Sequence, residues 1–304
     1  MRTVYMGTSA FAVDVLRALH ASRHRPLLVV TPPDRPRGRG RRVTPTPAAE
    51  AARELGLEVL QAESVNEPQS LEAIASARPE AIAVCQFGQL IKEPLLSDHL
   101  MLNVHPSLLP RWRGAAPIER TLMAGDERTG VTIFKIVAGL DSGPVALMEE
   151  EAVQPRDTAG TLSARLSKLG GALLVQALDR AEEGTLELTE QPQEGVTYAN
   201  KINTSERTLD LSRPARELER VVRALNPHVG AYLPLPSGER LGVASARANG
   251  ERLERGELRA LDGRVLVGAQ DGALELLEVQ PPGKRPMAIA DYLRGHELPS
   301  RADA

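Results

Sequence analysis

An asparagine and a histidine two residues apart are the side chains of this sequence best suited to chemistry. Asn103 and His105 lie in the run Leu-Met-Leu-Asn-Val-His-Pro over residues 100–106, whose apolar residues predict a β-strand. Residues i and i+2 of a strand project from one face, and Pro106 ends the strand. An amide and an imidazole would therefore converge at one strand end. On spacing alone, a polar strand end without function is the more frequent explanation of such a pair.

The elements around this pair predict an α/β fold. Residues 1–150 alternate short Val/Ile/Leu-rich runs with helical stretches, which is typical of βαβ units. The expected strands cover residues 2–6, 27–31, 57–60, 80–85, 101–105, 131–136 and 145–149. The expected helices cover residues 11–20, 48–55, 70–77, 117–124 and 158–183, the last with Asp157 as its cap. We expect a Rossmann-like, doubly wound and mostly parallel sheet, in which sites form at the carboxyl ends of strands.

A second helical pattern follows Thr204. Ser212 is the expected cap, Pro214 lies in the first turn, and Asn226-Pro227 stops the helix after Leu225. Helical spacing predicts one core face and one basic face. The core face holds Leu218, Val221, Val222 and Leu225, and the basic face holds Arg213, Arg216, Arg220 and Arg223.

The domain organisation follows from these changes of pattern. Pro- and Thr-containing sequence after Gly184 is the best linker candidate. Residues 231–280 consist of short apolar segments between Gly and Pro turns, which predict a small OB-like β-barrel. We expect an α/β domain over residues 1–186, a linker over 187–204 and a C-terminal β-barrel domain over 205–304.

The composition limits where the protein acts and what it binds. The single cysteine, Cys85, allows no disulfide within the chain, and no apolar run is long enough to cross a membrane. We therefore expect a cytoplasmic protein without membrane contact. A net charge of −3 predicts that any nucleic-acid contact is local. The segment from Arg35 to Arg42, with five arginines between Pro and Gly residues, is expected to be a basic loop and the candidate surface.

Two further motifs favour no cofactor. Gly7-Thr8 follows a strand, as in a dinucleotide site, but the second and third glycines of that fingerprint are missing. We therefore expect no NAD. His20 and His24 have the spacing of a helical metal pair but lack a glutamate partner. We therefore expect no metal.

The segment after His105 resembles a family signature. Residues 107–118 read Ser-Leu-Leu-Pro-Arg-Trp-Arg-Gly-Ala-Ala-Pro-Ile, similar to the run after the catalytic strand of the 10-formyltetrahydrofolate-dependent formyltransferases. The resemblance is strongest to the members that formylate methionyl initiator tRNA. Further matching motifs are Gly7-Thr8 with Phe11, Pro33–Pro36, Val131–Ile133, Gly139–Gly143, Val196–Ala199 and Gln280–Lys284.

The resemblance implies a catalytic trio and a formyl donor. The trio would be Asn103, His105 and Asp141. The Asn103 amide and a protonated His105 would stabilise the oxyanion that forms when an amine attacks the formyl carbon. Asp141 would favour the imidazolium or accept a proton from the amine. The co-substrate would be 10-formyltetrahydrofolate, and the residues expected to bind it are Phe87, Gly88, Leu90, Ser107, Leu108, Leu109, Pro110, Gly139 and Leu140.

The resemblance also implies methionyl initiator tRNA as acceptor and partner, bound by a monomeric protein. Guanidinium groups suit phosphate binding. The residues expected to contact the tRNA are Arg37, Arg39, Arg41, Arg42, Arg216, Arg220 and Lys284.

Several other activities remain open on the sequence. A formyltransferase of the same architecture could act on an amino sugar nucleotide or on glycinamide ribonucleotide, although the latter kind lacks a comparable C-terminal domain. The arginine-rich loop and the block over residues 111–118 disfavour the sugar nucleotide. A 10-formyltetrahydrofolate hydrolase would keep the trio and pass the formyl group to water. A non-catalytic folate- or RNA-binding module would have no need of the intact trio.

Overall fold

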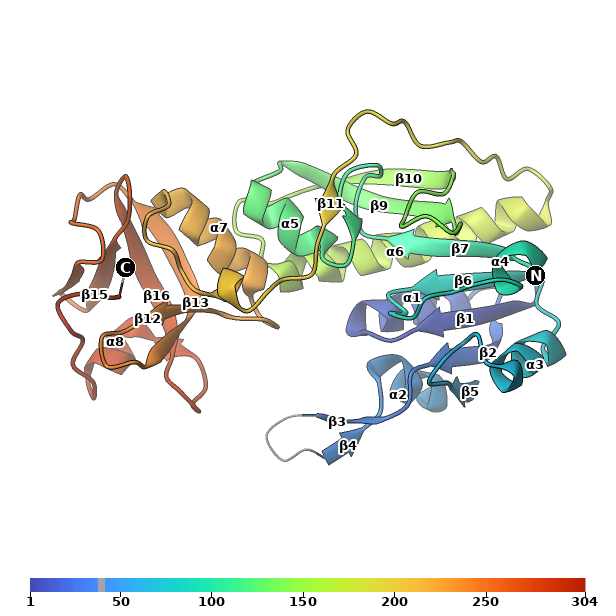
Figure 1. The fold of residues 1–304 in the computed structure, drawn as a ribbon, viewed down its shortest axis with the longest axis horizontal. Coiled ribbons are helices and arrows are strands. Elements are labelled where there is room, and N and C mark those ends of the chain that lie inside the picture. The colour runs from blue at the N-terminus through green and yellow to red at the C-terminus, as the bar shows by residue number, and fades with distance from the viewer. Residues whose placement is uncertain (38–41, 304) are drawn as a thin grey trace. The chain divides into compact units, whose positions relative to one another are not determined.

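A seven-stranded sheet forms the centre of the first part of the computed structural model, which describes residues 1–37 and 42–303 (Figure 1). β1, β2, β5, β6 and β7 pair in parallel, whereas β9 and β10 are antiparallel. The prediction of a mostly parallel sheet is confirmed. In spatial order the strands are β10 (Val145–Ala152), β9 (Arg128–Lys135), β7 (Leu100–His105), β6 (Ala81–Cys85), β1 (Thr3–Gly7), β2 (Pro26–Thr31) and β5 (Glu58–Gln61).

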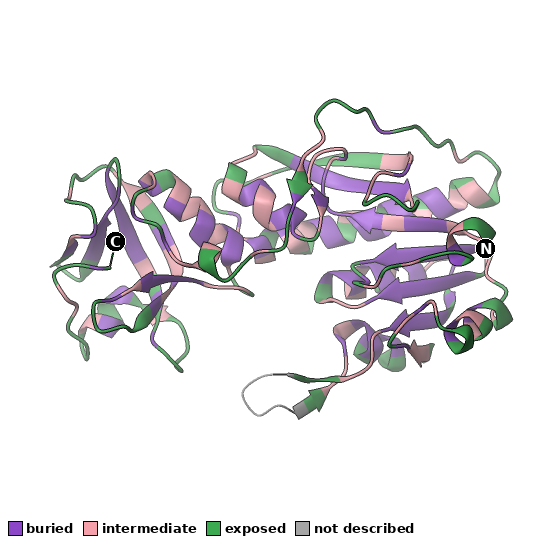
Figure 2. Cartoon of the chain, in the orientation of Figure 1, coloured by how far each residue is buried: buried purple, intermediate pink, exposed green. Residues whose placement is uncertain are grey.

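Helices cover both faces of this sheet, so its central strands β1 and β6 are largely apolar and fully buried (Figure 2). Val4 and Met6 of β1 pack in one cluster with Ile74. Tyr5, which alternation turns to the opposite face, donates its hydroxyl hydrogen bond to the Ala12 carbonyl at 2.6 Å. The helices of this part are α1 (Ala10–His20), α2 (Pro47–Glu54), α3 (Pro68–Ser76), α4 (Leu95–Asp98) and α6 (Ala159–Glu182).

The cap expected for α6 is wrong by one residue. The helix begins at Ala159, so Thr158 directly precedes it, and the Thr158 hydroxyl accepts from the Thr161 N–H at 3.2 Å. Asp157 lies one position too early to reach that donor. Its carboxylate instead accepts from the Gln154 N–H at 2.7 Å and from the Thr161 hydroxyl at 2.8 Å.

The sequence predicts a loop from Arg35 to Arg42, but the ends of this segment form two short strands. β3 (Arg35–Arg37) and β4 (Arg42–Thr44) pair antiparallel, with Pro36 opposite Val43 (Figure 1). Proline lacks an N–H but is tolerated in a short edge strand, which is why its presence does not prevent this hairpin. Arg39 and Arg41 lie outside the described residues.

An antiparallel sheet forms the last part of the chain, as expected for a small barrel. α7 (Ala215–Leu225) packs on it, and the predicted core residues Leu218, Val221, Val222 and Leu225 are all buried in one cluster with Val243 and Leu274. The strands are β12 (Ala231–Pro234), β13 (Arg240–Asn249), β14 (Leu258–Leu261), β15 (Arg264–Gly268), β16 (Ala273–Gln280) and β17 (Met287–Ala288), followed by α8 (Ile289–Leu293).

The start of α7 differs from the sequence-based expectation. Ser212 is too far from the helix to cap it, because the first helical residue is Ala215. The Ser212 hydroxyl hydrogen-bonds to the Asp210 carboxylate at 2.6 Å. The first N–H of the helix, that of Ala215, donates instead to the Asp271 carboxylate at 2.9 Å. Asp271 is distant in the sequence, so local patterns do not reveal this partner.

The described chain divides into two compact units. The first contains residues 1–114, 128–152 and 163–198, and the second contains 115–127, 153–162 and 199–304. α5 (Pro117–Ala124) belongs to the second unit, together with the short η1 helix (Ser205–Arg207). β8 (Arg113–Gly114) and β11 (Tyr198–Ala199) lie where the chain passes between the units. Among the described residues, none of the helices has the length and apolar composition that crossing a membrane requires.

We predict that Leu102→Ala destabilises the first unit strongly, because the Leu102 side chain in β7 is 0% exposed. Loss of a buried leucine side chain costs about 2–5 kcal/mol. Urea unfolding should show this loss. Leu27→Ala is the matched control, because Leu27 is 48% exposed and its loss should change stability by less than about 0.5 kcal/mol. Equal midpoints for the two variants would contradict the assignment of the core.

Candidate active site

The ring of His105 is held by two contacts at the carboxyl end of β7. Its Nε2 lies 2.9 Å from the Trp112 carbonyl oxygen, and its Nδ1 lies 3.7 Å from Asp141 Oδ2. A carbonyl oxygen can only accept, so Nε2 carries the hydrogen. In the neutral ring Nδ1 then has the lone pair, and it faces the carboxylate. His105 can therefore accept a proton at Nδ1.

The Asp141 carboxylate is fixed by the backbone of another segment. Its Oδ2 accepts a hydrogen bond from the Gly114 N–H at 2.8 Å. Asp141 has a φ of 43°, in the left-handed region that non-glycine residues seldom adopt. Trp112 and Gln86 share this conformation, with φ values of 63° and 46°. Strained backbone of this kind gathers at functional sites.

Burial decides the charge of His105. The side chain is 5% exposed, and removal from water lowers its pKa below that of an ordinary histidine, although Asp141 and the bond to Trp112 act in the opposite direction. The lowered pKa favours the neutral imidazole at neutral pH.

Asn103 lies on the same face of β7 as His105. It stands in register with Val84 of β6 and Phe134 of β9, and its side chain is half-buried. Within residues 1–37 and 42–303, its amide group has no hydrogen-bond partner. A free amide N–H at a strand end is suited to bind the oxygen of a substrate.

The residues expected to bind folate occupy different environments. Phe87, Ser107 and Leu109 are buried, whereas Leu90 and Leu140 are 69% and 62% exposed. Leu108 and Pro110 are half-buried, and Gly88 and Gly139 are exposed. The Ser107 hydroxyl donates to the Arg111 carbonyl at 2.7 Å, so it already has an acceptor within the chain.

Thr132 of β9 orders the segment after His105, a role that the sequence did not reveal. Its hydroxyl donates to the Ser107 carbonyl at 2.7 Å and accepts from the Leu109 N–H at 3.1 Å. Thr132 is fully buried, so both bonds form away from water and hold the turn rigidly. The signal in the sequence is the place of Thr132 within the Val131–Ile133 motif, between two apolar residues.

The expected tRNA contacts are distributed unevenly. Arg37 and Arg42 are paired in the backbone register of β3 and β4, and Arg216 and Lys284 are exposed. The Arg220 side chain instead donates to the Ala124 carbonyl at 3.3 Å, and Arg223 donates to the Asp157 carbonyl at 2.8 Å. Two arginines of the basic face predicted for α7 therefore form hydrogen bonds within the second unit and are less available to a phosphate.

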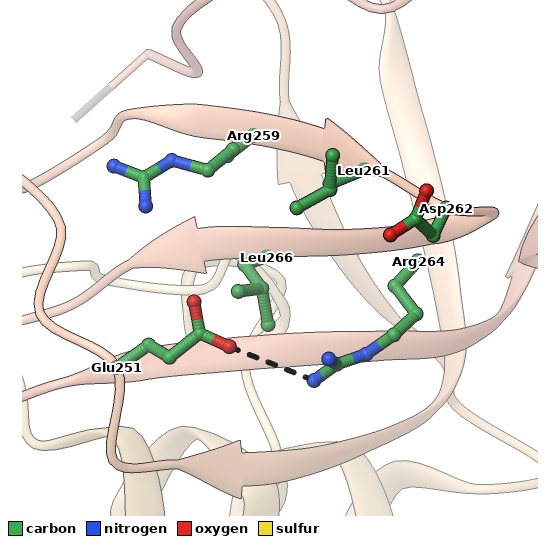
Figure 3. A pocket seen from close by; sticks show the side chains of 6 residues that line it. All are labelled: Glu251, Arg259, Leu261, Asp262, Arg264 and Leu266. Atoms are coloured by element: carbon green, nitrogen blue, oxygen red, sulfur yellow. Dashed lines mark ion pairs between the residues drawn. The ribbon is translucent and has the colours of Figure 1, made fainter.

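A hollow in the second unit is built from ion pairs and carries no evident chemistry. Arg264 lies 3.8 Å from Glu251 (Figure 3). It also lies 2.9 Å from Glu275. Arg264 and Arg247 lower the pKa of Glu275 to about 2, so this carboxylate stays charged and links β13, β15 and β16. In the part of the chain that the structure describes, no group of three His, Cys, Asp or Glu side chains could hold a metal ion. The residues that line the hollow are Glu251, Arg259, Leu261, Asp262, Arg264 and Leu266.

Comparison with protein families identifies the family of this chain. Residues 1–178 match the family described as "Formyl transferase", and residues 201–297 match "Formyl transferase, C-terminal domain". The chain belongs to this formyltransferase family. Among its relatives, the methionyl-tRNA formyltransferase of Paracoccus denitrificans is 42% identical over 309 residues, covering 100% of both chains. That of Streptomyces coelicolor is 44% identical, covering 98% of this chain and 97% of the relative.

Solved structures of more distant proteins share the fold. An N-formyltransferase from Helicobacter canadensis, in complex with folinic acid and dTDP-3-aminofucose, has a TM-score of 0.67 at 16% identity and covers 91% of this chain and 98% of that chain. HypX from Aquifex aeolicus, in complex with tetrahydrofolic acid, has a TM-score of 0.66 at 18% identity, covering 100% of this chain and 51% of that chain. At these identities the likeness establishes the fold.

We predict that His105 titrates below the value of about 6.5 usual for histidine. Asp141→Asn should lower the midpoint further, because the carboxylate stabilises the imidazolium. Nitrogen chemical shifts of the ring, followed against pH, measure both midpoints. The matched control is Asp98→Asn, since Asp98 is exposed and precedes β7 whereas His105 ends it. A midpoint that Asp141→Asn leaves unchanged would show that the carboxylate does not act on the ring.

Proposed function

We propose that this protein transfers the formyl group of 10-formyltetrahydrofolate to the amino group of methionyl initiator tRNA. The observation that carries the proposal is the lone pair of His105 Nδ1, which lies beside Asp141 and on the same strand face as the Asn103 amide, for which the described residues offer no hydrogen-bond partner. The family and the methionyl-tRNA formyltransferase relatives supply the substrates. The reaction belongs in the cytoplasm, because charged initiator tRNA is a substrate of translation.

The first step forms the new C–N bond. The neutral amine of the methionyl group attacks the formyl carbon on N10 of the folate, and the carbonyl electron pair moves to oxygen. The Asn103 amide N–H donates to this oxyanion. His105 Nδ1 accepts the proton that the attacking nitrogen must lose, and Asp141 stabilises the resulting imidazolium.

The second step breaks the bond to N10. The oxyanion reforms the carbonyl, the C–N10 bond cleaves, and the imidazolium returns its proton to N10 as that nitrogen leaves. His105 is neutral again, and no covalent enzyme intermediate forms. The formyl carbon keeps its oxidation state throughout, so the reaction itself requires no redox cofactor.

We place the folate along residues 107–110, near Phe87-Gly88 and Gly139-Leu140. The exposed Leu90 and Leu140 offer apolar surface that a pterin or benzoyl ring could cover. Irregular backbone around Gly88 and Gly139 offers hydrogen bonds for one edge of the pterin.

We assign the tRNA to arginines of the β3–β4 hairpin and to residues of the C-terminal region. Residues 1–186 would form the catalytic domain, 187–204 a linker and 205–304 the tRNA-binding domain, in keeping with the family matches over 1–178 and 201–297. Exposed Arg216 and Lys284 remain available for phosphate contacts, whereas the contact of Arg220 with Ala124 reduces its share.

The function is tested by offering radiolabelled 10-formyltetrahydrofolate with one acceptor at a time. Charged initiator tRNA should become labelled, whereas charged elongator tRNA and an amino sugar nucleotide should not. Labelling of the sugar nucleotide alone would replace the proposal with the sugar formyltransferase. Release of formate without an acceptor, at the same rate as with tRNA, would identify a hydrolase.

We predict that His105→Ala and Asn103→Ala each lower kcat by about 10²–10⁴-fold, the loss typical of one acid–base or oxyanion group. The KM for the formyl donor should change little, because neither side chain is needed to hold the folate. Initial-rate kinetics with both substrates measure the two constants. His99→Ala is the matched control at the opposite end of β7. Normal turnover in both variants would place the reaction elsewhere.

We predict that replacing four arginines within residues 37–42 by alanine raises the KM for charged tRNA and flattens its salt dependence, because fewer counterions are released on binding. The KM for folate should stay constant. The control variant replaces the same number of arginines at exposed positions elsewhere. An equal rise in the KM for tRNA in both variants would show that only the net charge of the protein matters. The test replaces Arg37, Arg39, Arg41 and Arg42, and the control replaces Arg2, Arg17, Arg53 and Arg128.

A further inference from the structure

A segment between α6 and β11 runs beside the active site and is bonded to it at both ends. Thr189 exchanges two backbone hydrogen bonds with Val145 of β10, at 2.7 and 2.9 Å. At the other end, the Thr197 carbonyl accepts from the Arg113 N–H at 2.9 Å, and the Thr197 hydroxyl accepts from the Trp112 N–H at 2.9 Å. The segment therefore spans the distance between the strand after Asp141 and the residues that contact His105.

Gln191 is the buried polar side chain within this segment, with 6% of its surface exposed. Its Nε2 donates to the carbonyl oxygens of Asp141 and Gly143, both at 2.8 Å. Its Oε1 accepts from Arg113 Nε at 3.1 Å and from Nη2 at 2.7 Å. Both amide hydrogens and both lone pairs are thus used. The two carbonyls and the guanidinium leave only one orientation for the amide.

These bonds join the two segments that hold His105. Residues 112–114 supply the carbonyl that fixes Nε2 and the N–H that fixes the Asp141 carboxylate. Residues 139–143 carry Asp141 itself. Gln191 contacts both segments through one planar group, so a shift of either segment must stretch a buried hydrogen bond.

We propose that Gln191 is a positioning residue for formyl transfer, which sets Asp141 at the Nδ1 side of His105. It touches neither reacting atom. Its amide fixes the backbone of Asp141 relative to Arg113, and thereby the separation between carboxylate and imidazole. This role rests on the proposed function, and it adds to the trio a residue from the segment that the sequence suggested to be a linker.

The competing explanation is that Gln191 only stabilises the fold. A buried amide with four satisfied hydrogen bonds would do so in any protein, and its loss would leave unpaired carbonyls. The two roles differ in what a substitution changes. A structural residue alters the unfolding temperature, whereas a positioning residue also alters the titration of His105 and its dependence on Asp141.

The test compares Gln191→Met with Gln191→Glu. Methionine has a similar length but no hydrogen bonds, and glutamate can still accept from Arg113 but cannot donate to the two carbonyls. Both variants should lower kcat by about 10–100-fold, since a displacement near 1 Å can cost 10²-fold. The KM for the formyl donor should change less than kcat, because Gln191 is not among the residues expected to bind the folate. Gln193→Met is the matched control, since Gln193 is exposed on the same segment.

A double-mutant cycle with Asp141→Asn provides the decisive comparison. If Gln191 acts through Asp141, Gln191→Met should change kcat by less than about twofold once the carboxylate is gone. If the fold losses in kcat of the two single variants multiply in the double variant, the two residues act independently, and this result would overturn the proposal. So would full activity of both Gln191 variants, or a glutamate variant as active as the native protein.

The titration of His105 tests the same role without substrate. Gln191→Met should lower the midpoint, as Asp141→Asn does, because the displaced carboxylate no longer stabilises the imidazolium. An unchanged titration midpoint of His105 would show that Gln191 stabilises the fold without positioning Asp141. A native protein that fails to formylate methionyl initiator tRNA would refute the proposed function, while this titration would still decide the position of Asp141.

Discussion

The hydrogen bond from His105 Nε2 to the Trp112 carbonyl is the interaction on which the site depends. It leaves one tautomer of the neutral ring and directs the basic nitrogen toward Asp141, while burial favours the neutral form of the ring. The acceptor is a residue with left-handed backbone, whose N–H is held in turn by Thr197. The chemistry of the imidazole is thus set by main-chain geometry, which side-chain identity alone does not specify.

Periodicity accounts for the part of the site that could be predicted. Alternation along one strand places Asn103 and His105 on the same face, and the mostly parallel sheet brings that strand end to the region where such folds bind ligands. Asp141 required the family resemblance, because it lies in a turn with a rare backbone conformation. Gln191 gave no signal: it is one polar residue in an aperiodic segment, and its partners lie far away in the sequence.

The spacing of arginines predicted their surroundings less well than the spacing of apolar residues predicted their burial. The core residues of α7 are buried as helical spacing predicts, because apolar area must leave water wherever the helix packs. Arginines follow no such rule. Arg220 and Arg223 satisfy backbone carbonyls of neighbouring segments, while Arg216 stays exposed at an equivalent position of the same stripe. Spacing identifies a face, but it does not reveal what covers that face.

The segment from Thr189 to Thr197 follows the residues of the candidate site in the chain, and this order has a consequence for protein synthesis. A nascent chain that has emerged only as far as Glu182 contains the complete parallel core, the asparagine, the histidine and the aspartate. It has none of the bonds by which Thr189, Gln191 and Thr197 secure the surrounding turns. The ribosome therefore releases the residues of the candidate site before the segment whose hydrogen bonds hold the turns around them.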